Sequence, residues 1–145
     1  MYDTILLPTD GSEGAAAVAD HVGALAERFD ATVHVLAVAD TRNRFESPSS
    51  GLAPDVWEES ENERARAAVD DTVALLPESV TAEGAVESGV PHETILEYAE
   101  TEGMDVVVMG THGRTGLDHY LIGSVAERVV RRSPVPVLTV RIGEE

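Results

Sequence analysis

The sequence predicts an α/β fold in which a parallel sheet is covered by helices on both faces. Two observations support this prediction: short apolar runs alternate with amphipathic segments of helical period, and loops that contain glycine follow two of the runs. Such alternation is typical of right-handed βαβ units, which form parallel sheets. With 145 residues, 43% of them hydrophobic, the chain is expected to be a single domain over residues 1–145.

The first half of the chain contains two predicted strands with a helix between them. Residues 4–7 form an apolar run that Pro8 ends, as expected for a strand buried on both faces. Ser12 is a candidate cap for a helix of about five turns, whose apolar positions recur every three or four residues. These positions are Ala15, Val18, Ala19, Val22, Leu25, Ala26 and Phe29. Residues 32–38 predict the second strand, and the polar stretch 39–53 predicts a long loop.

The middle of the chain predicts two helices and a strand. Residues 54–76 predict a long helix, and residues 80–86 predict a strand near a sheet edge because a charged residue and a glycine interrupt its apolar pattern. The apolar stripe of the helix consists of Ala65, Val69, Val73 and Leu76. Pro91 suits the first position of the next helix, which Gly103 ends.

The last third predicts a central strand, a glycine-rich loop, a helix and a fifth strand. Residues 105–109 form the most apolar run in the chain and predict the central strand. The loop 110–123 leads into a helix, and residues 135–142 predict the fifth strand. The positions expected to face inward on this helix are Val125, Ala126, Val129 and Val130.

The composition excludes several function classes. The chain has 27 acidic and 10 basic residues, a net charge of −17, and this surface repels nucleic acids and anionic membranes. We interpret the charge as an adaptation to the salt-rich cytosol of a halophilic organism, with an ordinary acidic protein as the alternative. The absence of cysteine excludes disulfides and thiol chemistry, and the five histidines show no metal-ligand spacing. No leader or membrane-spanning run is visible, so a cytoplasmic location is expected.

Two loops carry the candidate binding residues, because ligands of parallel sheets bind beyond the carboxyl ends of the strands. One loop is 9–12, and the other, 110–124, contains four glycines and ends where a helix begins. Glycine lets backbone amides approach an anion, and the start of a helix favours phosphate. Ser124 and Arg114 could add contacts to the phosphates. The alternative is a surface loop with turn glycines. The P-loop fingerprint is excluded because the chain has no lysine, and the spacing of glycines for dinucleotide binding is also absent.

The spacing of Gly110, Gly113, Gly123 and Ser124 resembles the ATP-binding signature of the universal stress protein family. The resemblance covers essentially the whole chain, including the segments 5–12, 89–91, 105–110 and 133–137. It implies a five-stranded parallel sheet in the order 3-2-1-4-5, which is Rossmann-like and similar to the adenine nucleotide alpha hydrolase-like fold.

The resemblance also implies roles for individual residues. Asp10 would meet the ribose, whereas without the resemblance it would be interpreted as a turn or cap residue. The adenine wall would consist of Pro8, Thr9, Val38 and Met109. The phosphate cradle and its neighbours would be Gly110, His112, Gly113, Arg114, Gly123, Ser124 and Val125.

The function that the resemblance implies is that of an ATP-binding regulatory protein, with Mg²⁺ or Mn²⁺ accompanying the phosphates. The family usually dimerises through the last strand, so a homodimer through residues 135–142 is expected. Two alternatives stay open. One is a slow Mg- or Mn-dependent ATPase, for which the sequence offers no dedicated base and no assigned catalytic residue. The other is an interaction module that binds no nucleotide.

Overall fold

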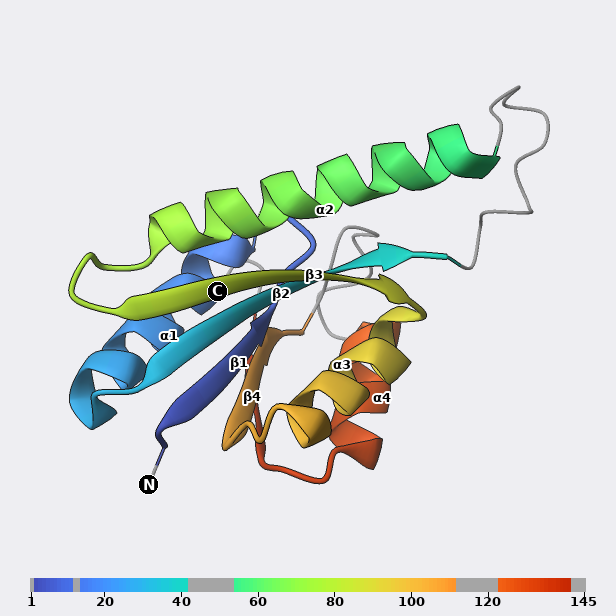
Figure 1. Cartoon of the computed structure of the whole chain (residues 1–145). Helices are drawn as coiled ribbons and strands as arrows, with labels where there is room; N and C mark the ends of the chain where they lie inside the picture. Colours follow the sequence, from blue (N-terminus) through green and yellow to red (C-terminus); the bar gives the residue numbers. More distant parts are fainter. Residues whose placement is uncertain (1, 12–13, 42–53, 112–122, 142–145) are drawn as a thin grey trace.

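The computed structural model describes residues 2–11, 14–41, 54–111 and 123–141, which form a five-stranded parallel sheet with helices around it (Figure 1). The strands are β1 (Thr4–Pro8), β2 (Thr32–Asp40), β3 (Thr81–Gly89), β4 (Val106–Gly110) and β5 (Val137–Val140). The helices are α1 (Ala15–Phe29), α2 (Pro54–Leu75), α3 (Pro91–Thr101) and α4 (Ser124–Arg132). The strand order is β3-β2-β1-β4-β5, so the predicted fold class and strand order are confirmed.

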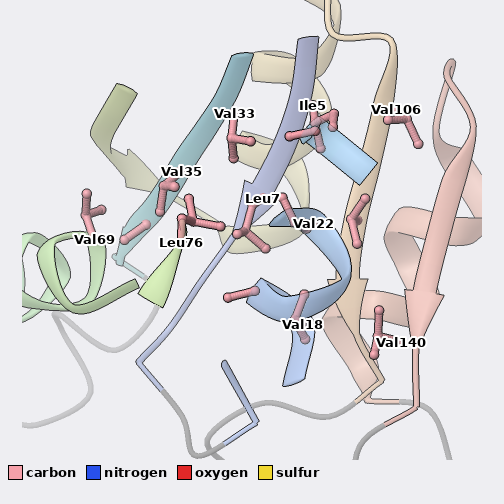
Figure 2. Packing of buried hydrophobic residues seen from close by; sticks show 14 of the residues in the cluster. Ile5, Leu7, Val18, Val22, Val33, Val35, Val69, Leu76, Val106 and Val140 are labelled. Carbon is pink, nitrogen blue, oxygen red and sulfur yellow. The ribbon is translucent and has the colours of Figure 1, made fainter. Parts of the chain in front are cut away.

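The side chains of the central strands alternate between two hydrophobic clusters, one on each face of the sheet. Ile5 and Leu7 of β1 pack against α1 and α2, whereas Leu6 packs on the face that α3 and α4 cover. This alternation follows from the two-residue period of a strand. Figure 2 shows the first cluster, where side chains of β1 and β2 meet those of α1 and α2. Burial on both faces explains why β1 and β4 are short, continuous apolar runs.

The strand order places β1 and β4 side by side, although about one hundred residues separate them in the chain. From β1 the sheet grows toward β2 and β3 on one side, and toward β4 and β5 on the other. The direction of growth therefore reverses between β1 and β4. In parallel α/β sheets, a crevice for ligands opens at this reversal, beyond the carboxyl ends of the strands.

Several boundaries and orientations differ from the sequence predictions. Helix α1 has 15 residues, about four turns instead of five, and ends at Phe29. The C-cap residue Asp30 has a left-handed φ of 56°. The N-cap residue of α1 is Gly14 and not the predicted Ser12, which lies outside the described residues. Val130 was expected to face inward on α4 but is 46% exposed, because this short helix buries only a narrow face. Strand β5 pairs with β4 only over Val137–Val140.

The described part of the chain contains no helix that is long and apolar enough to span a membrane.

Strand β3 forms one edge of the sheet, as its interrupted apolar pattern predicted. Gly84 in this strand is required by close packing, because a Cβ there would lie 2.5 Å from Cγ1 of Val69 on α2. The glycine that weakens the strand pattern therefore lets α2 pack closely on the sheet.

Candidate functional site

A cavity of about 210 Å³ lies at the carboxyl ends of β1, β2 and β4, at the reversal of strand order. Its walls come from the ends of these strands and from the beginnings of α1, α3 and α4, and one face of α2 completes them. This is the position in which parallel α/β folds bind ligands. Another depression among the described residues lies near the amino ends of β2 and β3, and it contains none of the predicted site residues.

The cavity brings together nine of the twelve site residues that the sequence predicted. They are Pro8, Thr9, Asp10, Val38, Met109, Gly110, Gly123, Ser124 and Val125. The other three, His112, Gly113 and Arg114, lie outside the described residues. Residues from β1, β2, β4 and α4 therefore meet at one cavity, although they are distributed over most of the chain.

One side of the cavity is mainly apolar. Val38 at the end of β2 and Met109 at the end of β4 line it, and Pro91 and Ile95 approach from the first turns of α3. Ile95 and Met109 are both buried in the cluster on the α3 and α4 face, so their positions are fixed by core packing. Such a surface suits a planar, weakly polar group such as a nucleobase.

Another part of the cavity wall is formed by the beginning of α4. Gly123 is the N-cap residue, with φ −66° and ψ 158°, and its carbonyl accepts a hydrogen bond from Glu127 N at 2.9 Å. Its own amide donates to the Thr111 carbonyl, and Thr111 N is bound to Val140 O at 3.0 Å, so the start of α4 is tied to β4 and β5. The amides of Ser124 and Val125 are in the first turn, where they have no partner within the helix. They can therefore bind an anion.

One of the two acidic residues that line the cavity among the described residues, Asp10, lies in a tight turn after β1. Thr9 N donates to Leu36 O at 2.8 Å, which continues the pairing of β1 with β2 by one residue. Gly11 N donates to Thr9 Oγ1 at 3.3 Å, and Gly11 has a left-handed φ of 78°. Asp10 stands between these two residues and lines the cavity. Its position makes the carboxylate an acceptor for hydroxyl groups of a ligand.

The lining residues that were not predicted from the sequence include Asp40, Arg64, Thr72 and Pro91. Asp40 was assigned to a loop, but it ends β2 and is only 9% exposed. Arg64 on α2 pairs with Glu61, and it is the only Lys or Arg among the described lining residues. Thr72 could have been noticed as a polar residue within the apolar stripe of α2. The other three give no local signal, because their approach to the cavity depends on tertiary packing.

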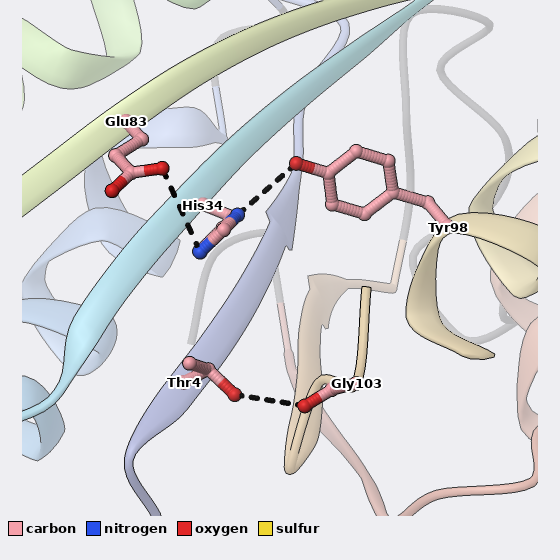
Figure 3. A network of polar contacts seen from close by, with 5 residues as sticks. All are labelled: Thr4, His34, Glu83, Tyr98 and Gly103. Atoms are coloured by element: carbon pink, nitrogen blue, oxygen red, sulfur yellow. Dashed lines mark hydrogen bonds and ion pairs between the residues drawn. The ribbon is translucent and has the colours of Figure 1, made fainter. Parts of the chain in front are cut away.

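His34 is placed away from the cavity lining, in a polar contact network on the α3 face of the sheet (Figure 3). Its Nδ1 lies 3.0 Å from the hydroxyl of Tyr98, and its Nε2 lies 3.9 Å from a carboxylate oxygen of Glu83. Burial, followed by the charges of Glu102, Glu83 and Glu87, raises the pKa of Tyr98. The network joins β2, β3 and α3. Within the described ranges, no group of three or more His, Asp or Glu side chains is arranged to hold a metal ion.

Comparisons with known proteins give one consistent result. The Universal stress protein family model matches residues 1–141. Universal stress protein MJ0531 from Methanocaldococcus jannaschii is 38% identical, with 97% of this chain and 83% of the relative aligned. The structure of MJ0577 from the same organism is 34% identical, covers 100% of this chain and 99% of its own, and has a TM-score of 0.76.

A third relative was solved with a ligand. This universal stress protein, in complex with cAMP, is 26% identical to the present chain. The superposition covers 97% of each chain with a TM-score of 0.62. The match to the family model extends over almost the whole sequence, and the fold is similar to those of the solved relatives. The chain therefore belongs to the universal stress protein family.

Proposed function

We propose that this protein binds ATP, or a related adenine nucleotide, in the cavity at the carboxyl ends of β1, β2 and β4. The observation that carries the proposal is the assembly of this cavity, which combines an apolar side, an acidic turn and the beginning of α4. These three features suit a base, a ribose and a phosphate group, respectively. Relatives support the nucleotide class, because one of them was solved with cAMP.

In the proposed complex, each part of the nucleotide has its own contacts. Val38 and Met109, with Pro8 and Thr9, form the wall for adenine, and Asp10 accepts hydrogen bonds from the ribose hydroxyls. The phosphates lie at Gly110, Gly123, Ser124 and Val125, and we assign His112, Gly113 and Arg114 to the same role. A Mg²⁺ or Mn²⁺ ion on the phosphates would neutralise part of their charge and so reduce their repulsion from a protein of net charge −17.

We further propose a regulatory role in the cytoplasm for the nucleotide. A ligand that binds only the folded state stabilises it, and a partner can then recognise the occupied form. Regulation is favoured over rapid hydrolysis because the sequence offers no dedicated base for the slow ATPase that is the alternative.

The test is to identify what the protein carries. Protein recovered from cells at high salt and then denatured should release an adenine nucleotide, which chromatography and mass spectrometry would identify. A variant with Gly123 replaced by leucine, purified in parallel, controls for nucleotide that adheres elsewhere. Release of guanine nucleotides, or equal release from both proteins, would contradict the proposal.

We also propose that two copies associate through β5. This strand is the edge of the sheet next to β4, and Leu138 on it is 42% exposed. An edge strand with an exposed apolar side chain favours association with another chain, and a symmetric dimer would bury this edge. Light scattering should show a dimer that becomes monomeric with Leu138→Glu. Leu75→Glu, which charges a leucine of α2 that is 45% exposed, is the matched control. A dimer that survives Leu138→Glu would show that another surface is used.

A further inference from the structure

Thr72 is a buried hydroxyl on the apolar face of α2. Its buried neighbours on this face are Ala65, Ala68 and Val69, and the buried Leu76 directly follows the helix. Thr72 itself is only 1% exposed. A hydroxyl loses its water on burial and destabilises the fold unless a protein group replaces the lost hydrogen bonds. The hydroxyl of Thr72 lies 2.8 Å from Thr9 Oγ1, so this bond joins α2 to the turn that follows β1.

Thr9 also holds the turn that contains Asp10 in place. Its amide is bound to Leu36 O on β2, and its hydroxyl accepts the amide of Gly11, so a bond is present on each side of Asp10. The turn also lies close to α2, because a Cβ added at Gly11 would be 3.3 Å from the Cβ of Ala68. Ala68 and Thr72, one helical turn apart, therefore contact the same turn of the chain.

We propose that Thr72 is a positioning residue for the nucleotide site. Its hydroxyl fixes the rotamer of Thr9, and the Thr9 hydroxyl then holds Gly11, so that the carboxylate of Asp10 is presented to the ribose. The inference rests on the proposed function of the cavity. Thr72 acts through Asp10, so the helix α2 determines the geometry of a residue that lies more than sixty positions earlier in the chain.

The first test compares three variants of α2. Thr72→Val keeps the shape of the side chain and removes the hydroxyl, whereas Thr72→Ser keeps the hydroxyl. Val69→Ala is the matched control, because Val69 is buried on the same helix but does not line the cavity. Affinity for Mg·ATP, measured by calorimetry at high salt, should fall about five- to tenfold with Thr72→Val. Thr72→Ser and Val69→Ala should bind about as tightly as the wild type, although Val69→Ala should melt earlier.

The second test combines Thr72→Val with Asp10→Ala. If Thr72 acts through Asp10, its replacement should have little further effect once the carboxylate is absent, so the double variant should bind Mg·ATP as weakly as Asp10→Ala alone. Additive losses would show that Thr72 acts by another route, and they would overturn the inference.

The third test needs no nucleotide. In the ligand-free protein, amide exchange at Gly11 measured by NMR should be about threefold or more faster in Thr72→Val than in wild type, and normal in Thr72→Ser. Unchanged exchange together with unchanged Mg·ATP affinity would overturn the inference while the proposed function stands. An equal loss of affinity in all three variants would also overturn it, since general loosening of α2 would then be the cause. If the wild type binds no nucleotide at all, the proposed function fails, and the inference fails with it whatever the rate of amide exchange at Gly11.

Discussion

At the scale of single residues, Gly123 and Asp10 line the same cavity and offer different chemistry. Gly123 precedes the first turn of α4 and leaves space in front of its amides, whereas Asp10 presents a carboxylate from the turn after β1. One residue contributes by lacking a side chain, and the other by accepting hydrogen bonds. The two can therefore be tested independently of each other.

Replacing Gly123 with leucine should prevent ATP from reaching the beginning of α4. The backbone of Gly123 has φ −66°, which other residues adopt without strain, so the change introduces no backbone strain. In wild type, ATP at about 100 times its Kd should stabilise the protein by about 2.7 kcal/mol, and this ATP-dependent shift in Tm should disappear in the variant. The Tm without ATP should change little. Val130→Leu, on the exposed side of α4, is the control and should keep the full shift.

Replacing Asp10 with alanine should weaken ATP binding by about 1 to 3 kcal/mol, because a carboxylate that accepts ribose hydroxyls makes charge-assisted hydrogen bonds. Calorimetry would measure the loss. Asp20→Ala removes an equal charge from an exposed position on α1, and it should leave the affinity unchanged. If both variants bind ATP equally well, the assignment of Asp10 to the ribose is wrong.

Some residues of the site could be predicted from the sequence, and others could not. The glycines and Asp10 form local patterns next to predicted strand ends, and a local pattern is sufficient to locate a turn or the start of a helix. Thr72 and Asp40 reach the cavity only because α2 packs over the end of β1 and because β2 continues to Asp40. Such contacts depend on packing between distant segments of the chain, and neither composition nor periodicity indicates this packing.

At the scale of elements, the amino ends of β1 and β4 are joined by a side chain. Oδ2 of Asp105 accepts hydrogen bonds from Asp3 N at 2.7 Å and from Thr4 N at 3.0 Å. Asp105 N donates to Thr4 O at 3.0 Å, and Thr4 Oγ1 donates to Gly103 O at 3.2 Å (Figure 3). The backbone amides of Asp3 and then Thr4 lower the pKa of Asp105 below its usual value. Asp105 therefore fixes β4 against β1 at the end of the sheet opposite the cavity.

The contribution of Asp105 to stability should depend on pH. Because its pKa is lower in the folded protein, ionised Asp105 stabilises the fold fully above its unfolded pKa, about 3.9, and the contribution is lost as pH falls through the folded value. Asp105→Asn should therefore lower the Tm at pH 7 by about 2 to 4 °C, and the difference should shrink below about pH 4. Thermal melts in molar KCl would measure this. Asp20→Asn is the control. A Tm difference between Asp105→Asn and wild type that stays constant from pH 7 to pH 3 would contradict the expectation.

The elements that the sequence predicted well are those with strong, continuous patterns. The bounds of β1, α2 and β4 agree with the prediction to within one residue, because each is either an apolar run or a helix that a proline ends. The inward face of α4 was predicted less well. Val130 follows the apolar spacing, but the buried residues of α4 are Ala126 and Val129, and Val125 is partly buried beside them. How wide a face a helix buries depends on its neighbours, which the sequence of the helix alone does not specify.

At the scale of the whole molecule, the dominant physical feature is the charge. With 27 acidic and 10 basic residues, the surface has a net charge of −17, and α2 contributes the exposed residues Glu59, Glu63, Asp70 and Asp71. Like charges repel one another more strongly in the compact state than in the unfolded chain, so this surface destabilises the fold at low ionic strength. It also opposes the approach of an anionic nucleotide to the cavity, so the affinity for ATP depends on salt as well.

Thermal stability should therefore rise steadily from low salt to molar KCl. The screening length falls from about 30 Å at 0.01 M salt to about 3 Å at 1 M, so repulsion across the surface is removed over this range. Replacing Glu59 and Glu63 with glutamine, and Asp70 and Asp71 with asparagine, lowers the net negative charge by four at exposed positions of α2. This variant should melt higher than wild type in low salt and should gain less from added KCl. A wild-type Tm that does not change with salt would show that the acidic surface is not an adaptation to a salt-rich cytosol. If Tm rises equally with KCl concentration in the two proteins, the increase in stability comes from a general effect of KCl on hydrophobic burial and not from charge screening.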